Sequence, residues 1–167
     1  MESLLLTELL FENLLSDLSP PELAAVLSVM IYERGDSEEV TVRNLHLKAL
    51  ENQMVTIMRR IITLEKECGL PVELTDDLLK TAVPVGFMEV AFNWCRGLPF
   101  AEVMKGTKLA EGFVVNQLLR TVQICRKLGS VANEIGNPPL SQKCEEVCQA
   151  MLRDIVYMPS LYLAEDN

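Results

Sequence analysis

Residues 107–136 read TKLAEGFVVNQLLRTVQICRKLGSVANEIG and form the longest helical pattern in the chain. Thr107 is suited to be the N-cap, since its hydroxyl can accept a hydrogen bond from an unpaired backbone N–H of the first turn. The pattern ends at Gly136, and Pro138 and Pro139 after it cannot continue a helix. We therefore expect one helix over about 108–136, which at 1.5 Å per residue is roughly 40 Å long.

The predicted helix has two unlike faces. Apolar residues recur every three or four positions, the spacing of a core-facing stripe. They are Val114, Leu118, Val122, Cys125, Leu128, Ala132 and Ile135. A second line of residues, the polar strip, is small at its start and then carries amide and basic groups. It consists of Gly112, Asn116, Arg120, Gln123, Lys127 and Ser130. The polar strip is either a solvated helix face or a surface that contacts an anionic, base-bearing strand, and periodicity does not distinguish the two.

Composition favours a single all-α domain over residues 1–167. Hydrophobic residues make up 49% of the 167-residue chain, which is enough for one sizeable core. Only 5% of the residues are aromatic, so leucine, valine, isoleucine and methionine supply that core and favour helices over a β-sandwich. We expect a bundle of about seven helices around the long one. Their predicted ranges are 2–17, 19–32, 42–68, 75–82, 85–95, 99–105 and 139–158, with Ser19 and Thr75 as N-caps.

Charge is distributed unevenly along the chain. The net charge is −9, and residues 1–39 account for −8 of it, with nine acidic residues and one basic residue. Residues 94–130 carry six basic and two acidic residues, a local charge of +4. The overall charge argues against tight, autonomous binding of nucleic acid, whereas the local charge permits a phosphate-bearing partner at the long helix.

Several kinds of chemistry are not indicated. The chain has no phosphate-binding GxxxxGK[ST] loop, acidic DExH box, nucleophile elbow or HExxH motif, so we expect no catalytic residues in it. Five cysteines without a CxxC pair, and one distant histidine, His46, argue against a zinc site. The odd number of cysteines and the lack of a signal-peptide pattern favour reduced thiols inside a cell, and no apolar run approaches membrane-spanning length. Trp94 is interpreted as a core anchor.

Four stretches of the sequence together resemble a known family. They are LSPPELAAVLS at 18–28, WCRGLPF at 94–100, Glu111-Gly112 with Arg120, and IGN at 135–137 with RDIV at 153–156 and SLYL at 160–163. Their order and spacing resemble the DSHCT domain, the C-terminal helical domain of exosome-associated, superkiller-type DExH-box RNA helicases. The resemblance covers nearly the whole chain, and the stretch from Gly97 to Cys125 is closer to the cytoplasmic superkiller branch than to the nuclear branch.

The resemblance implies a fold, partners and a function. It implies a helical bundle packed against RecA-like motor domains, with the long helix, the ratchet helix, beside the 3′-to-5′ path of single-stranded RNA. ATP and Mg would be held by the motor domains of a larger parent helicase, of which this chain is a C-terminal fragment, and no cofactor is expected here. Exosome-associated cofactor proteins are the further partners implied, and the expected location is intracellular and cytoplasmic.

The resemblance also implies RNA contacts for residues of the long helix. Members of the family carry arginine at the positions of Asn116 and Arg120, so Arg120 matches and Asn116 departs. Arg120 would pair with phosphate or stack on a base, while Asn116 and Gln123 would hydrogen-bond bases or sugars. The remaining candidates are Gly112 of the Glu-Gly motif, together with Lys127 and Arg126 as sources of positive field. Two alternatives stay open: a helical protein-interaction module without RNA contact, and the ratchet domain of a related DNA helicase.

Overall fold

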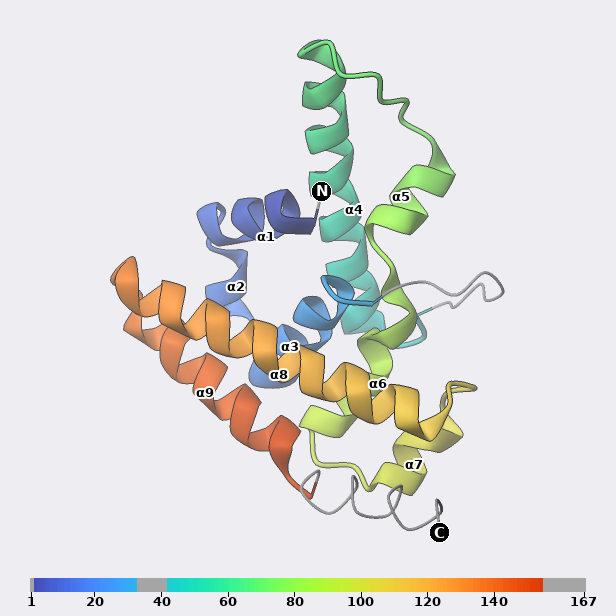
Figure 1. Cartoon of the computed structure of the whole chain (residues 1–167), viewed down its shortest axis with the longest axis vertical. Coiled ribbons are helices and arrows are strands. Elements are labelled where there is room, and N and C mark those ends of the chain that lie inside the picture. The colour runs from blue at the N-terminus through green and yellow to red at the C-terminus, as the bar shows by residue number, and fades with distance from the viewer. Residues whose placement is uncertain (1, 33–41, 155–167) are drawn as a thin grey trace, which may run out of the picture.

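The structure is a computed structural model that describes residues 2–32 and 42–154. Within these residues it has nine α-helices, one 3₁₀ turn and no strand, which confirms the all-α class (Figure 1). In chain order the elements are α1 (Glu2–Phe11), α2 (Leu14–Asp17), α3 (Pro20–Val29), α4 (Leu45–Glu67), α5 (Asp76–Ala82), the 3₁₀ turn η1 (Val85–Phe87), α6 (Met88–Cys95), α7 (Phe100–Lys105), α8 (Glu111–Glu134) and α9 (Pro138–Leu152).

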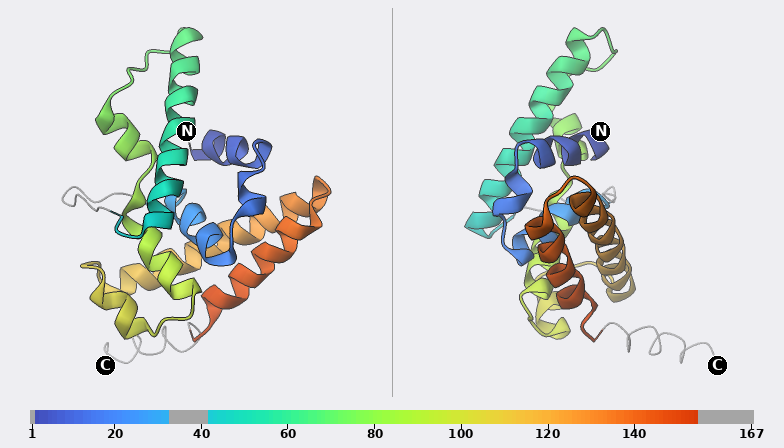
Figure 2. Two further views of the ribbon diagram at one scale, coloured as in Figure 1. Left: turned by 180° about the vertical axis from the view of Figure 1, so that it is seen from behind. Right: turned by 90° about the vertical axis from the view of Figure 1, so that its left-hand side faces the viewer.

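The bundle is built on α3 and on the hairpin formed by α8 and α9. These last two helices lie side by side along their lengths, and α3 packs against both of them and against α6 (Figures 1 and 2). Helix α3 is the most enclosed element, since every residue from Leu23 to Val29 is buried. Helix α8 covers α3 and keeps one side exposed, so the centre of the bundle belongs to α3 rather than to the long helix alone.

Helix α4 projects from the body of the bundle (Figure 1). Its inner residues, such as Leu47, Met54 and Met58, are buried, as expected from their spacing. Toward the far end of the helix the side chains are less covered, and Leu64 is 52% exposed. Leu70 and Leu74, in the connection to α5, are exposed as well. The tip of α4 therefore presents apolar side chains that this chain does not cover.

The N-terminal helical segment is broken where one helix over 2–17 was predicted. Helix α1 ends at Phe11, and Asn13 adopts a left-handed backbone conformation with φ 59° before α2 begins. Asparagine tolerates this conformation better than most residues, because its short polar side chain can hydrogen-bond locally. The break redirects the chain so that Leu5, Leu9 and Leu15 all reach the core.

Two of the three predicted helix caps are confirmed. The Ser19 backbone N–H donates to Glu22 Oε2 at 2.8 Å, as a capping box requires, and Thr75 Oγ1 accepts from the Leu78 backbone N–H at 3.1 Å. Thr107 is not a cap, because α8 starts four residues later, after Ala110. The Thr107 hydroxyl instead accepts from the Leu109 backbone N–H at 3.2 Å, a local turn that competes with helix formation.

The last helix is shorter than the predicted range of 139–158. Helix α9 ends at Leu152, and Arg153 has an extended backbone with φ −52° and ψ 134°. Its guanidinium turns back and donates hydrogen bonds to the backbone oxygens of Trp94 and Leu98. Tyr162 and Leu163, part of the SLYL stretch that contributes to the resemblance, lie outside the described residues.

Candidate nucleic-acid interface

The predicted apolar stripe of α8 is its buried face. Val114, Leu118 and Cys125 are fully buried, and the other stripe residues up to Ala132 are buried with them. Ile135 is the exception, with 61% of its surface exposed. It is the C-cap residue of α8, so it lies beyond the last turn that packs on the core. The 3.6-residue periodicity thus predicted the buried face and failed only at the helix end.

The predicted RNA-contact residues of the polar strip lie along the opposite face of α8. Gly112, Asn116, Gln123 and Lys127 are exposed, and Arg120 is half-buried. At 100° per residue these positions fall within one outward line, because they recur at steps of three and four. Ser130 extends the line and is exposed too. The structure therefore brings these predicted residues onto one continuous surface.

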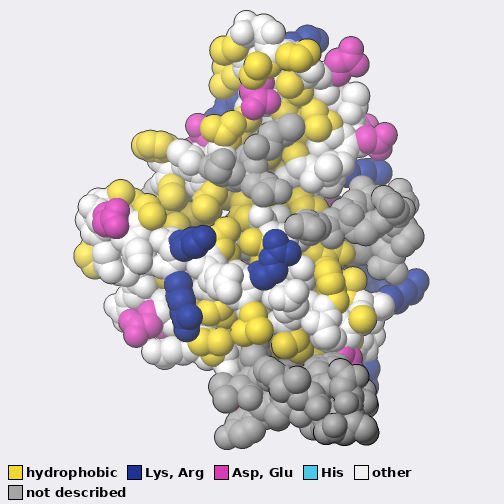
Figure 3. Space-filling model, in the orientation of Figure 1, with side chains coloured by type: hydrophobic (Ala, Val, Ile, Leu, Met, Phe, Trp, Pro, Cys, Tyr) yellow, Lys and Arg dark blue, Asp and Glu magenta, His cyan; other side chains and the backbone are white. Residues whose placement is uncertain are grey.

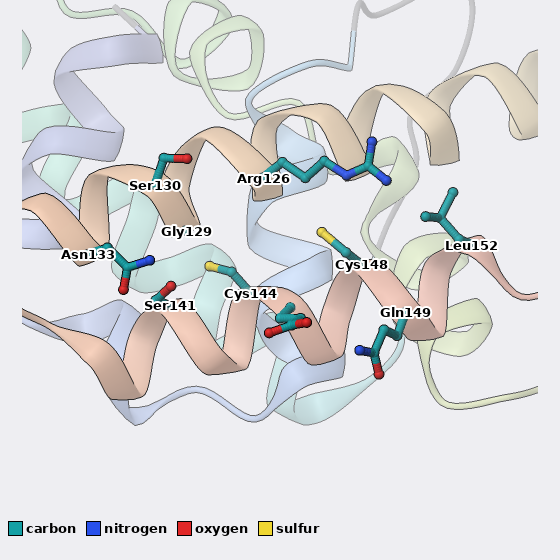
Figure 4. Close-up of a pocket in the computed structure, with 10 residues that line it drawn as sticks. Arg126, Gly129, Ser130, Asn133, Ser141, Cys144, Cys148, Gln149 and Leu152 are labelled. Atoms are coloured by element: carbon teal, nitrogen blue, oxygen red, sulfur yellow. The ribbon is translucent and has the colours of Figure 1, made fainter.

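Arg126 lies on the flank of this line rather than on it. Its side chain is exposed but extends over the groove between α8 and α9, toward Cys148 (Figure 4). On an α-helix it is rotated by about 80° from the line through Asn116 and Lys127. Arg126 therefore serves a different surface from the other five candidates, although it adds positive charge to the same side of the molecule.

The outward side of α8 is free of acidic residues over most of its length. Between Glu111 and Glu134 the sequence has three basic residues and no acidic residue. In Figure 3, Lys and Arg side chains gather over α8 in the middle of the face, and acidic side chains lie toward its edges. Neither Arg126 nor Lys127 forms an ion pair with another described residue. No carboxylate of the described residues therefore neutralises their charge.

Gly112 has no packing role in the described structure. Its φ is not in the left-handed region, and a Cβ built at this position would meet no atom within 4 Å. A glycine in a helix costs about 1 kcal/mol relative to alanine, so nothing in the fold explains its presence in the second position of α8. The site is a flat, open patch of backbone at the start of the polar strip.

Gln117 was not predicted as a special residue, yet it is the buried neighbour of Asn116. Only 2% of its surface is exposed, and its Oε1 has no hydrogen-bond partner among the described residues. The residue type gives no signal for this burial, since glutamine is usually exposed. The helical phase does, because Gln117 lies one turn from Val114 and beside the apolar stripe. Its burial excludes it from the polar strip.

A pocket of about 390 Å³ lies in the groove between α8 and α9 (Figure 4). It is lined by Arg126, Gly129, Ser130, Asn133, Ser141, Cys144, Glu145, Cys148, Gln149 and Leu152. Gly129 lets the two helices approach closely, because a Cβ built there would lie 3.2 Å from Cys144 Cβ. The two cysteines of α9 thus face α8 at its closest approach.

Three thiols, those of Cys125, Cys144 and Cys148, lie at the contact between α8 and α9. The sequence spacing predicted only the pair on α9. Cys144 and Cys148 share a face of α9, as their spacing predicts, and Cys125 on α8 lies against that face. The Cys125 thiol donates to the Cys144 backbone oxygen at 3.3 Å, and the Cys148 thiol donates to the Val122 backbone oxygen at 3.8 Å. The neighbouring Cys125 side chain and the charge of Arg126 outweigh burial and lower the pKa of the Cys148 thiol to about 7. The proximity of the two α9 thiols, together with burial, raises the pKa of Cys125. The part played by Cys125 depends on how the two helices pair, which no local pattern encodes.

Two general properties complete the description of the site. Among residues 2–32 and 42–154, no group of three His, Cys, Asp or Glu side chains is arranged to hold a metal ion. Within the same ranges, none of the helices combines the length and the apolar character that crossing a bilayer requires.

Residues 1–158 match the DSHCT (NUC185) domain family. The chain is 35% identical over 159 residues to superkiller complex protein 2 of Homo sapiens, a match that covers 95% of this chain and 12% of that protein. It is 32% identical over 162 residues to the ATP-dependent RNA helicase mtr4 of Schizosaccharomyces pombe, covering 97% of this chain and 14% of that protein. For the exosome RNA helicase MTR4 of Mus musculus the identity is 31% over 162 residues, with 97% and 15% covered. The chain therefore belongs to the DSHCT domain family, and its relatives are DExH-box RNA helicases of the superkiller and Mtr4 types.

Proposed function

We propose that the polar strip of α8 contacts and guides single-stranded RNA within an ATP-dependent helicase that delivers RNA to the exosome. The observation that carries the proposal is the exposed line from Gly112 to Lys127, which has basic and amide groups and no acidic residue. The relatives are named as RNA helicases, an exosome helicase and a superkiller complex protein, which supports the same conclusion.

The residues of the polar strip fit a contact that does not depend on base sequence. Arg120 offers a planar, permanently charged group that can pair with phosphate or stack on a base. Asn116 and Gln123 offer amide groups to bases or riboses, and Lys127 adds charge near the end of the line. Gly112 leaves its backbone open, so a strand can approach the first turn of α8 closely.

The remaining activity of the helicase is proposed to lie in parts outside this chain. ATP and Mg belong to RecA-like motor domains, and no ATP chemistry is assigned to the residues described here. Large apolar side chains are exposed on α1 and α4, with Phe11 at 82% and Leu45 at 84%. We propose that such residues, together with the apolar tip of α4, contact the rest of the parent protein, and the superkiller-like sequence supports a cytoplasmic location.

The decisive experiment measures RNA unwinding by the full helicase that carries this domain. Arg120→Ala should reduce RNA-stimulated unwinding, because one strand contact is lost. Arg120→Lys should rescue only part of the loss, since an ammonium group keeps the charge but lacks the planar fork. Arg59→Ala is the matched control, because Arg59 is exposed on α4, away from the polar strip. Unchanged unwinding by Arg120→Ala would mean that the polar strip is only a solvated surface.

Crosslinking separates this function from the two alternatives. Photocrosslinked RNA should map to peptides within residues 112–127 of the helicase, and single-stranded DNA should compete poorly. No crosslink there would favour a protein-interaction module, for which the exposed apolar side chains of α1 and α4 provide a surface. Equal competition by DNA would favour the ratchet domain of a DNA helicase.

A further inference from the structure

We propose that Cys148 is a peroxide-sensitive thiol and that Cys125 converts its oxidised form into a disulfide that cross-links α8 to α9. The proposal rests on the three-thiol cluster and on the pocket beside it, and it does not depend on RNA binding. Nothing in the proposed function uses these thiols.

The geometry gives Cys148 access to small molecules in solution. It lines the 390 Å³ pocket, and its Sγ points into the groove between the two helices (Figure 4). Its surface is 8% exposed, compared with 2% for Cys144 and 0% for Cys125. A peroxide molecule is small enough to enter such a pocket, so Cys148 is the thiol of the cluster that meets an oxidant first.

The surroundings of Cys148 favour its reactive form. A thiolate rather than a thiol attacks peroxide, and a neighbouring cation stabilises the thiolate. Arg126 extends toward Cys148 from the facing helix (Figure 4), and the Cys148 thiol donates to the backbone oxygen of Val122, one turn before Cys125 on α8. Glu145, on the same helix as Cys148, raises the pKa and so acts in the opposite direction, but the net effect is a pKa of about 7. The surroundings of Cys148 therefore favour its thiolate more than those of an ordinary buried cysteine.

The reaction proceeds in two balanced steps. The Cys148 thiolate attacks one oxygen of hydrogen peroxide, the O–O bond breaks, and hydroxide leaves, so that sulfur is oxidised to a sulfenic acid. The Cys125 sulfur then attacks Cys148 Sγ, an S–S bond forms and the S–O bond breaks. The leaving hydroxide takes the proton of Cys125 and becomes water. Hydrogen peroxide is the only oxidant that the sequence of steps needs.

The test treats the 167-residue chain with hydrogen peroxide at pH 7 in a Cys68→Ser background. This substitution removes the exposed thiol of Cys68, which would otherwise form disulfides between molecules. The folded chain should lose the mass of two hydrogen atoms and yield a tryptic link between residues 121–126 and 144–153. Reducing agent should reverse the change, and circular dichroism verifies that each variant is folded.

Matched variants identify the two sulfur atoms. Cys148→Ser should abolish the link, whereas Cys144→Ser should retain it, although both residues lie in the same tryptic peptide. Cys125→Ala should leave Cys148 as a sulfenic acid that dimedone captures. Arg126→Gln should slow oxidation several-fold at pH 7 and little at pH 9, where most of the thiol is ionised in either protein. A link that persists in Cys148→Ser, or a folded chain whose cluster resists oxidation, would overturn the proposal.

Discussion

The junction of α6 with α9 and the polar strip of α8 both carry basic side chains, but in different surroundings. At the junction, Arg153 Cζ lies 3.9 Å from the centroid of the Trp94 ring, and the guanidinium donates to two backbone oxygens. On the polar strip, Lys127 is exposed and forms no ion pair with any described residue. The fold gives the first cation two backbone acceptors and an aromatic face, and leaves the second to solvent or to a partner. The comparison indicates which basic residues serve stability and which remain available for binding.

The largest effect on stability is expected from Trp94→Ala. Trp94 is 1% exposed, its Nε1 donates to the Met151 backbone oxygen at 2.9 Å, and its ring packs edge-on against Phe100. Truncating a buried aromatic side chain costs about 3–5 kcal/mol, so urea unfolding should show a loss of that order. RNA binding per folded molecule should be unchanged. If the variant melts like the parent but loses RNA, Trp94 is a stacking platform and its structural assignment is wrong.

Arg153→Met should have the next largest effect. Methionine can still cover the Trp94 ring, but it leaves the backbone oxygens of Trp94 and Leu98 without their charged donor. Hydrogen bonds to charged groups contribute about 1.5–3 kcal/mol, and we expect a destabilisation within that range. Arg153→Lys, the control, should recover part of it. Thermal melting at fixed salt measures both variants, and an unaffected Tm for Arg153→Met would mean that the junction does not depend on this cation.

Gln117→Met sharpens the comparison within α8 itself, because Gln117 and Asn116 are adjacent but face opposite environments. Replacing a buried acceptor that has no partner by an apolar group should raise the free energy of unfolding by about 1 kcal/mol. Asn116→Met, at the exposed position, is the matched control and should give no such gain. A destabilised Gln117→Met would show that the amide makes a contact that outweighs its desolvation.

The smallest effects on stability are expected on the polar strip, where effects on binding should appear instead. Lys127→Ala should change the free energy of unfolding by no more than about 0.5 kcal/mol. The isolated chain should bind single-stranded RNA weakly, because few phosphates are contacted and the acidic N-terminal part repels the strand, and added salt should weaken this binding further. Fluorescence anisotropy of labelled RNA should show that Lys127→Ala weakens this binding and reduces its salt dependence. Salt-insensitive, submicromolar binding would contradict the account.

Two further variants of the polar strip test the role of Asn116, where the arginine implied by the resemblance is missing, and the role of the open backbone at Gly112. Asn116→Arg introduces the arginine that the resemblance implies for this position and should tighten RNA binding with a steeper salt dependence. Gly112→Val should leave the fold intact, because a Cβ meets nothing there, but should hinder the approach of the strand. Anisotropy measures both, with circular dichroism as the control for folding. Equal RNA affinity for Gly112→Val and the parent would remove Gly112 from the contact.

Local chemistry made some features predictable and left others out of reach. The Ser19–Glu22 capping box and the buried stripe through Leu118 follow from short-range spacing, and both are present. The break at Asn13 and the late start of α8 after Thr107 are choices between competing local bonds, which tertiary packing decides. The contact of Cys125 with Cys148 required knowing which helix packs against α9. The polar strip could be located from periodicity, whereas its ligand could not, since exposure alone does not identify a partner.

The hydrogen bonds between Ser16 of α2 and the start of α9 also bear on the order in which the helices pack during folding. Asn137 caps α9 and donates to Ser16 Oγ, and Lys143 donates to the Ser16 backbone oxygen, so these bonds join residues 121 and 127 positions apart. Contacts of such high sequence separation form late, because a long loop must close first. During synthesis the side of α2 that packs against α9 therefore stays uncovered until α9 has left the ribosome, whereas α1 can already pack against α4.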